Sequence, residues 1–577
     1  MRRYRLTDSQ FADLAAGYGG PDAMATLVAG QRSKRKLLLR VVFDEAARLG
    51  VQSRLSTARA LLTRVRTQRP ELVEESFGYP FLDSWATRCV EDPRVAESYL
   101  SGFAASVASR AELPFSIAIP AADGVVYLPM LGTAAGLGDG PVTVSGDGRS
   151  LVLAGSVRTI TLAEPRQRQD GWEPVAVISA GAPERRLTVV IDDQDPHRNC
   201  FQWRVAPMLS SERREHLARL LAHAWQLIVA RHPEHACGMS VALRSVVPLV
   251  PPSPGGSVSA ASRVAGGAVA VAPPADAEEL ALLLVHEFAH MKLGGLLDLV
   301  DLHESQGRGL YRAPWRADPR PVGALLQGAY AHLAVTDYWR ARRISSSTAD
   351  REVDFEFAYW REQTKAAVAT LEGSGELTDA GRVFVAGLGE TVDRWHQDGV
   401  RGDIAEAVDD IAVLAAVRWR LANRAPVPDE VKRLARQWRE GAPCGALPED
   451  RDAALAAAPG PAGMPGLAGW LRSEAIGSPE GRANDVDEAD AAYLKGDLVA
   501  AAEHYARRVA SDLGDDLAWA GLARACRHLG WHAAASALEE RPALVRALVE
   551  ALRTPAVEGL AAWLGKEIGH EQGTFEV

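Results

Sequence analysis

The chain has 577 residues, of which 47% are hydrophobic and 24% are charged. These proportions are those of ordinary globular domains, and they exclude a mainly disordered or fibrous chain. The formal net charge of -10 argues against a protein that binds nucleic acid through a globally basic surface. At roughly 100–200 residues per domain, the length predicts about three or four structural units.

The five cysteines lie far apart and form no CxxC pair, so a thiolate zinc cluster and a disulfide scaffold are both disfavoured. A metal ion would therefore need His and carboxylate ligands. The N-terminal MRRYRLTDSQF is basic but is not followed by an apolar stretch, and the chain has no uninterrupted apolar run of about 18 residues. We therefore expect a cytoplasmic protein with neither a membrane nor a nucleic acid as partner.

Hydrophobic periodicity predicts an α+β protein that is mainly helical. The patterns divide the chain into five segments: an N-terminal helical region (1–95), a β-rich segment (96–205), an HExxH metal-binding catalytic region (206–440), a linker rich in Ala, Pro and Gly (441–485), and a second helical region (486–577). The β-rich segment is expected to be antiparallel because its β-branched runs FSIAIP, GVVYLPML, PVTVSG, SLVLAG and RLTVVI are short and separated by Gly, Asp and Pro.

The catalytic region is predicted to contain three helices that matter for the site, over about 208–232, 276–303 and 321–343. Two strands, SVALRSVVPLV and GGAVAVAPP, separate the first helix from the second. The pair Gly294–Gly295 is expected to end or bend the second helix. The strand GGAVAVA suggests the edge of a sheet, where an extended peptide could pair.

An acidic loop, IDDQDPHRN, closes the β-rich segment. Asp192, Asp193, Asp195 and His197 could bind a metal ion, since carboxylate and imidazole are common ligands. A loop at the end of a hairpin explains the same residues, and we favour that interpretation.

The C-terminal helical region contains an internal repeat. Gly496 and Gly530 are 34 residues apart, as are Ala501 and Ala535, and each Gly separates two helical segments. This period resembles tetratricopeptide helical hairpins. The repeat predicts either a groove that binds a peptide or a partner, or a helical cap on the main domain.

The motif HExxH occurs in LALLLVHEFAHMKLGG, where it comprises His286, Glu287 and His290. Residues four apart share a face of a helix, so both imidazoles can reach one metal ion. Four apolar residues before His286 support a helix. The alternative is a pair of hydrogen-bonded core histidines. We expect a zincin-like core built around this helix.

A third metal ligand is not fixed by the motif. The metzincin spacing fails, because leucines stand three and six residues after His290. His332 lies in the next predicted helix. It is the leading candidate, because the motif already supplies two ligands and a metal site needs a third. The carboxylates of Asp298, Asp301 and Glu304 are its rivals.

The metal and the chemistry remain open at this point. In a zinc peptidase, Glu287 would be the general base on metal-bound water, whereas an iron oxygenase would not need that role. Arg312, Arg316 and Arg320 lie between the two helices that carry the histidines, and a guanidinium there could clamp the carboxylate of an oxo-acid co-substrate. The alternative is that they are ordinary surface arginines.

Two stretches carry a family resemblance: LVHEFAHMKLGGLLDLVDL and YRAPWRADPRPVGALLQGAYAHLAVTDYW. With LTVVIDDQDPHR and LTDSQFADLAAGYGG, they resemble the HExxH-motif proteins found with ribosomally made peptide natural products. The likeness covers roughly residues 1–430. The family is understood as iron(II)- and 2-oxoglutarate-dependent peptide β-hydroxylases.

The resemblance implies that His286 and His290 bind iron(II), that His332 matches the YAH segment of the family, and that 2-oxoglutarate is the co-substrate. For its clamp we choose Arg316 and Arg320, with Arg312 as a third candidate. The leading hypothesis is an oxygenase that hydroxylates the β-carbon of a side chain in a ribosomal precursor peptide. The alternatives are a zinc metallopeptidase that uses Glu287, and a non-catalytic peptide-binding partner. The C-terminal repeats could also bind other peptide-maturation enzymes.

Overall fold

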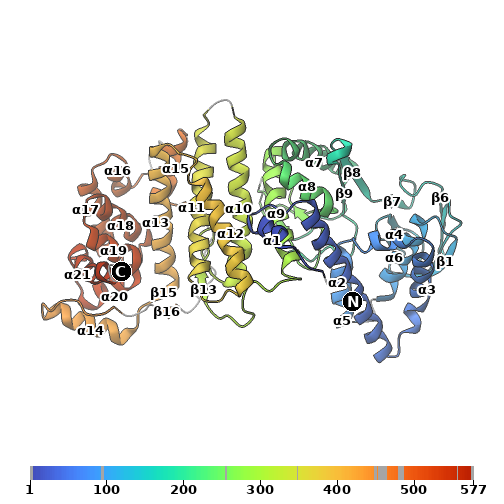
Figure 1. The fold of residues 1–577 in the computed structure, drawn as a ribbon, viewed down its shortest axis with the longest axis horizontal. Coiled ribbons are helices and arrows are strands. Elements are labelled where there is room, and N and C mark those ends of the chain that lie inside the picture. The colour runs from blue at the N-terminus through green and yellow to red at the C-terminus, as the bar shows by residue number, and fades with distance from the viewer. Residues whose placement is uncertain are drawn as a thin grey trace. The chain divides into compact units, whose positions relative to one another are not determined.

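The computed structural model describes residues 4–92, 96–253, 256–346, 349–447, 451–452, 464–478, 486–554 and 556–572. The chain is a mixed α+β protein in which helices predominate, as the sequence predicted. It divides into two compact units, Met1–Leu302 and His303–Val577, whose elements are labelled in Figure 1. No helix in these described ranges combines the length and the apolar character needed to cross a membrane.

The first unit begins with six helices: α1 (Asp8–Ala15), α2 (Pro21–Arg48), α3 (Ser53–Gln68), α4 (Pro70–Ser76), α5 (Phe81–Glu91) and α6 (Ala96–Arg110). A capping box between Thr7 and Gln10 starts α1, and Pro21 stands at the first turn of α2, where its missing N–H costs nothing. The described part of residues 1–95 is helical, as expected. Helix α6 extends the helical region into the segment predicted to be β-rich.

Nine strands follow: β1 (Phe115–Ala121), β2 (Val126–Leu128), β3 (Gly132–Ala134), β4 (Gly140–Gly146), β5 (Leu151–Ala154), β6 (Thr159–Leu162), β7 (Trp172–Pro174), β8 (Ala176–Ala180) and β9 (Leu187–Ile191). The predicted strands are confirmed. Strands β1, β4, β5 and β6 form one antiparallel sheet, and β2, β3 and β7 form another. Alternate side chains of β1 are buried, because successive residues of a strand point to opposite faces.

A five-stranded mixed sheet lies next to the HExxH helix, in the order β11-β12-β10-β9-β8. Its remaining strands are β10 (Ser245–Pro248), β11 (Ser259–Ala261) and β12 (Ala268–Val271). Strand β10 is parallel to β9 and β12, whereas β11 is antiparallel to β12. The prediction that GGAVAVA forms the sheet edge is wrong, because β11 pairs with β12 and occupies the edge itself. Burial of every residue in β12 agrees with an interior strand.

Three helices complete the first unit: α7 (Ser211–Arg231), α8 (Pro233–Ala242) and α9 (Ala277–Leu296). The side chain of Asp276 accepts a hydrogen bond from the backbone N–H of Glu279 and caps α9. Helix α9 continues through Gly294 and Gly295 and ends at Leu296, earlier than predicted. A β-carbon on Gly295 would already contact Leu27 of α2, so the small residue permits close packing there.

The second unit opens with a hairpin of β13 (Leu310–Arg312) and β14 (Pro319–Pro321). Helices α10 (Val322–Ser345), α11 (Arg351–Glu372), α12 (Asp379–Trp395), α13 (Gly402–Asn423) and α14 (Pro428–Arg439) follow. Figure 1 shows α10 and α11 as two long helices side by side. Helix α10 confirms the helix predicted at about 321–343. Two short strands, β15 (Arg424–Ala425) and β16 (Arg451–Asp452), pair across a longer stretch of chain.

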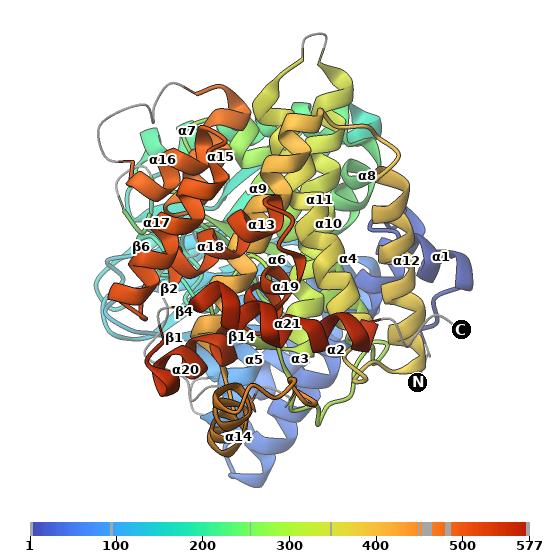
Figure 2. The same cartoon turned by 90° about the vertical axis from the view of Figure 1, so that its left-hand side faces the viewer.

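The last helices are α15 (Leu467–Ile476), α16 (Glu488–Leu494), α17 (Leu498–Ser511), α18 (Asp516–His528), α19 (His532–Glu540), α20 (Pro542–Leu552) and α21 (Val557–Gln572). Figure 2 shows this group from the side. The repeated glycines have the same function in both copies: Gly496 follows α16 and Gly530 follows α18, with φ of 79° and 76°. Such angles favour glycine after a helix end. Much of the predicted linker lies outside the described residues, and α15 lies within it.

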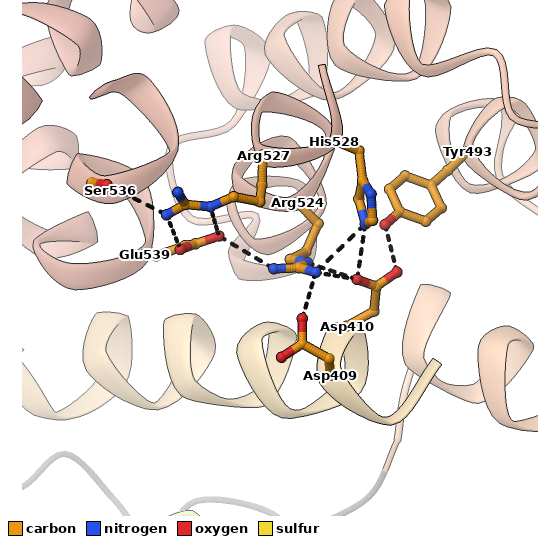
Figure 3. Close-up of polar contacts among 8 residues, drawn as sticks. All are labelled: Asp409, Asp410, Tyr493, Arg524, Arg527, His528, Ser536 and Glu539. Atoms are coloured by element: carbon orange, nitrogen blue, oxygen red, sulfur yellow. Dashed lines mark hydrogen bonds and ion pairs between the residues drawn. The ribbon is translucent and has the colours of Figure 1, made fainter. Parts of the chain in front are cut away.

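A buried ion-pair network joins α13 to the repeat helices (Figure 3). Arg524 of α18 donates hydrogen bonds to Asp410 and, at 2.9 Å, to Asp409, both on α13. The hydroxyl of Tyr493 on α16 donates to the other oxygen of Asp410 at 2.7 Å, and His528 lies 3.0 Å from the first. Because Arg524 and Asp410 are both buried, their charges compensate each other where water cannot.

Candidate metal-binding site

Helix α9 places His286 and His290 on one face, one turn apart. Their Nε2 atoms are 3.2 Å apart, and the rings are tilted by 78°. Two nitrogens at this separation, each about 2.1 Å from a common ion, would subtend an angle of about 100° at it, which is between octahedral and tetrahedral values. The pair therefore fits a divalent metal ion without rearrangement of the helix.

Glu287 is the buried residue between the two histidines, with a side chain only 3% exposed. Its Oε1 accepts a hydrogen bond of 2.6 Å from the hydroxyl of Ser259 on the edge strand β11 and is 3.9 Å from Nε2 of His286. Its Oε2 is buried and has no hydrogen-bond partner among the described residues. Burial raises the pKa of Glu287, while the nearby His290 and the hydrogen bond from Ser259 lower it.

The carboxylate of Asp298, a rival for the third ligand, is already bound within the first unit. Lys34 and Gln31 donate hydrogen bonds to its Oδ2 at 2.9 and 2.7 Å, and Arg263 donates to its Oδ1 at 2.7 Å. These donors lower the pKa of Asp298 against the effect of its burial. A metal ion would have to compete with two cations for this group. The other two rivals, Asp301 and Glu304, are exposed residues that follow α9.

His332 lies on α10 in the second unit, and its imidazole stands between two tryptophans. The ring of Trp315 stacks on it at a centroid distance of 4.0 Å, and the ring of Trp360 at 4.6 Å. The carbonyl oxygen of Gly328 is 2.8 Å from Nδ1. Because a carbonyl can only accept, Nδ1 carries the proton, and a neutral ring then presents an unprotonated Nε2. Metal-binding histidines are commonly held in this way.

The stacked tryptophan depends on a glycine that the motif did not reveal. A β-carbon on Gly328 would lie 2.3 Å from an atom of the Trp315 ring, so only glycine leaves room for the indole against α10. The loop that carries Trp315 is held by Asn423, which donates a hydrogen bond of 2.9 Å to the carbonyl of Ala317. Sequence reasoning missed Gly328 and Trp315. The spacing of Gly328 four residues before His332 was the available signal.

The three candidate clamp arginines separate into two groups. Arg316 and Arg320 both contact Asp318: Nε of Arg316 donates to one carboxylate oxygen at 2.7 Å, and Nη1 of Arg320 donates to the other at 3.0 Å. The two cations lower the pKa of Asp318. Arg312 lies on β13 and, like Arg316, lines a cavity of the second unit. The structure thus brings two of the three arginines to one carboxylate.

The acidic loop after β9 is buried in the first unit and contains a cluster of phenols and carboxylates. The Tyr79 hydroxyl lies 2.7 Å from Asp192 Oδ2 and 2.8 Å from Asp195 Oδ2, and the Tyr99 hydroxyl donates to the same oxygen of Asp195 at 2.7 Å. The Tyr127 hydroxyl is 2.9 Å from that of Tyr79. Burial raises the pKa of Asp192 to about 7 and that of Asp195 to about 6.

The other members of the acidic loop also have partners within the protein. Asp193 Oδ2 accepts hydrogen bonds from Arg214 at 3.0 Å and from the backbone of Leu209 at 2.8 Å. His197 packs edge-on against the ring of Tyr99, and burial lowers its pKa to about 4. The loop therefore ties helices to the β-rich region through side-chain hydrogen bonds, which agrees with the structural interpretation favoured from the sequence.

Comparison with protein-family models finds none that matches the chain, and comparison with curated proteins finds no match. His286, Glu287 and His290 form one group in the first unit, and His332 with its tryptophans forms another in the second.

Proposed function

We propose that the protein is an iron(II)- and 2-oxoglutarate-dependent oxygenase that hydroxylates the β-carbon of a side chain in a ribosomal precursor peptide. The observation that carries this proposal is the geometry of the HExxH side chains. Two imidazole nitrogens at 3.2 Å suit a chelated metal, while Glu287 is tied to the edge strand through Ser259. An oxygenase needs the pair of histidines but no carboxylate base.

His286 and His290 would hold the iron, with His332 as the third ligand. The hydrogen bond from His332 Nδ1 to the Gly328 carbonyl supports this assignment, since it directs the basic lone pair to Nε2. When bound, iron with 2-oxoglutarate and O₂ would supply the oxidation that converts a C–H bond to C–OH while 2-oxoglutarate becomes succinate and CO₂. Trp315 and Trp360 would fix the orientation of His332 by stacking on both of its faces.

The co-substrate carboxylate would bind to Arg316 and Arg320. Their contacts with both oxygens of Asp318 support this choice, because the same two guanidinium groups can hold one carboxylate from two sides. A 2-oxoglutarate carboxylate would replace Asp318 as their partner. Since Asp318 is on the same loop, its displacement would couple co-substrate binding to the conformation of the loop.

The peptide would bind along β11, the edge of the mixed sheet. An edge strand offers unpaired backbone groups to an extended chain. Strand β11 also carries Ser259, which contacts Glu287 beside the histidines. The antiparallel edge strand beside an HExxH helix supports a zincin-like arrangement of this region. The C-terminal helices would bind other enzymes of peptide maturation.

A zinc metallopeptidase is the second candidate function. Its supporting observation is the Oε2 atom of Glu287, which is buried without a hydrogen-bond partner among the described residues. A general base on metal-bound water needs an oxygen that is free to accept a proton. In this alternative the edge strand would bind the peptide that is cleaved.

A single experiment separates the two functions. Anaerobically purified protein is incubated with iron(II), 2-oxoglutarate and the small peptide encoded beside its gene, and air is then admitted. A peptide heavier by one oxygen atom, with an equivalent amount of succinate, supports the oxygenase. Cleavage of the peptide that is sustained by zinc and indifferent to 2-oxoglutarate would falsify it.

Glu287→Gln sharpens the distinction, because glutamine keeps the size of the side chain and an acceptor for Ser259. The oxygenase is expected to retain hydroxylation within about tenfold. A peptidase would lose its general base, which typically contributes about 10²–10⁴-fold in rate. Metal content measured on the same preparations shows whether the variant still binds the ion.

A further inference from the structure

A cavity of about 530 Å³ lies wholly within the second unit. Its walls come from the loop after β13, from α11 and α13, and from the repeat helices α16 and α18. Four aromatic side chains line it: Trp315, Trp360, Trp419 and Tyr359. Cavities of about 300–1,000 Å³ with such walls are typical of ligand sites. One of the two arginines proposed for the co-substrate clamp, Arg316, also lines this cavity, whereas Arg320 does not.

The acidic side chains in this cavity all have donors within the protein. Glu356 accepts hydrogen bonds from Trp360 and Arg472, each at 2.9 Å. Asp490 accepts one from a tyrosine hydroxyl at 2.6 Å, and Asp516 accepts one from an arginine at 3.1 Å. These carboxylates therefore have partners without any ligand.

Two cationic side chains of the cavity, unlike these carboxylates, have no hydrogen-bond partner among the described residues. Arg312 and Arg418 line the cavity, and neither guanidinium forms a hydrogen bond or ion pair within the part of the chain that the structure describes. The Nη2 atom of Arg312 is fully buried and has no acceptor there. Burial and the neighbouring Arg420 lower the pKa of Arg312 to about 10. Asp516 is the carboxylate whose charge acts on Arg418, but it lies beyond ion-pair distance.

An uncompensated buried cation is costly, and a carboxylate ligand would remove much of that cost. We propose that this cavity binds an acidic segment of the peptide substrate, with a carboxylate side chain on Arg312 and Arg418 and apolar neighbours against the tryptophans. A small dicarboxylate would leave most of the volume unfilled, whereas a few residues of extended peptide would occupy it. The inference rests on the proposed function, since it assigns a recognition site to the same peptide.

The test measures binding to the metal-free, full-length protein by calorimetry, without 2-oxoglutarate. The probe is acetyl-Phe-Glu-Phe-amide, and its matched control is acetyl-Phe-Gln-Phe-amide. Loss of a charge-assisted hydrogen bond should weaken the glutamine peptide at least about tenfold. Equal affinity of the two peptides, or no binding of either, overturns the proposal.

Variants connect the selectivity to the named arginines. Arg312→Gln and Arg418→Gln should each reduce the preference for glutamate several-fold, and the double variant should abolish it. Arg308→Gln is the matched control, because Arg308 is exposed in the preceding loop and does not line the cavity. Preference for glutamate that survives the double variant contradicts the assignment.

A second measurement does not depend on the peptide. Because the Nη2 atom of Arg312 is buried without an acceptor among the described residues, Arg312→Gln should raise the melting temperature of the free protein. Removal of a purely structural arginine would lower it. In a separate titration, 2-oxoglutarate is added to the complex with the glutamate peptide. If it displaces the peptide and binds with comparable affinity, the cavity is a site for small dicarboxylates. If the protein hydroxylates its peptide but binds the glutamate and glutamine peptides equally, only this inference is wrong. If it prefers the glutamate peptide but hydroxylates nothing, only the proposed reaction is wrong.

Discussion

The carboxyl groups of Asp192 and Asp195 share the hydroxyl of Tyr79. One phenol has one proton, so it can donate to only one of the two carboxylate oxygens at 2.7 and 2.8 Å. The other short contact needs a proton from the carboxyl group itself. The geometry therefore favours one protonated carboxyl group, which agrees with the raised pKa values of both.

This proton sharing predicts how stability depends on pH. Folding raises the pKa of Asp192 from 3.8 to about 7, so the folded state binds a proton more tightly than the unfolded state. The free energy of unfolding should therefore fall as pH rises from about 4 to about 7. Asp192→Asn keeps a donor for Tyr79 and removes the titrating group. Denaturant unfolding at several pH values should show a flatter profile for the variant.

Asp193→Asn is the control for that profile. Asp193 is buried in the same loop but pairs with Arg214 at 3.0 Å. Its replacement should lower the free energy of unfolding throughout the range, because it breaks an ion pair, and should leave the slope of the profile in place. A slope that vanishes with Asp193→Asn instead would show that the phenol cluster is not its source.

His332 allows a second prediction at the residue scale. If it completes the metal site, His332→Ala should reduce iron affinity at least about tenfold, since even the loss of a group that hydrogen-bonds to a metal ligand commonly costs 10–100-fold. Iron content of purified protein, compared with His286→Ala, measures the effect. His303→Ala is the control, because this histidine of the second unit packs against Gly323 rather than between tryptophans. Unchanged iron content in His332→Ala would move the third ligand elsewhere, with Asp301 the next candidate.

At the scale of elements, α10 and the loop before it fit together through one glycine. Gly328→Ala would place a β-carbon 2.3 Å from the ring of Trp315. The indole must then move away from His332, and overpacking of this kind typically costs about 1–3 kcal/mol. Thermal unfolding measures the loss of stability, and iron content measures the effect on the histidine.

The matched variant for Gly328 is Gly389→Ala in α12. A β-carbon on Gly389 would meet Val368 at 3.4 Å, which is ordinary van der Waals contact. Since alanine favours helix by about 1 kcal/mol over glycine, Gly389→Ala should stabilise the protein slightly. Equal effects of the two substitutions would contradict the steric explanation.

The predicted elements agree with the structure where a local signal exists. Asp276 and the apolar run after it identify the start of α9, and the β-branched runs identify β1, β4 and β5. The end of α9 and the edge of the mixed sheet were predicted wrongly. The sheet edge depends on a strand distant in sequence, since β11 pairs with β12, and Gly295 near the end of α9 lies next to Leu27 of α2.

At the scale of the whole molecule, Arg524 is expected to control the stability of the second unit. Arg524→Ala would leave Asp410 buried beside a histidine and a tyrosine, without its main counter-charge. Breaking a buried pair in this way typically costs about 3–5 kcal/mol. Hydrogen exchange should show faster opening of α13 and α16–α19, with the mixed sheet of the first unit much less affected.

Arg508→Ala provides the comparison for that variant. Arg508 pairs with Asp515 at 2.7 Å, but its side chain remains 28% exposed, so water can replace the lost partner. Its removal should cost about 1 kcal/mol or less. If the two substitutions lowered the free energy of unfolding equally, burial would not explain the role of Arg524.

The sequence by itself determined the fold class, most helices, the HExxH pair and the 34-residue repeat, because each follows from a short-range period or spacing. The tertiary structure alone decided which donors hold Asp298, which strand is the sheet edge, and that Trp315 and Trp360 stack on His332. It also showed that Arg312 lines a cavity and that its buried Nη2 atom has no acceptor among the described residues. These facts depend on side chains that meet only after the chain has folded, and no local pattern encodes them.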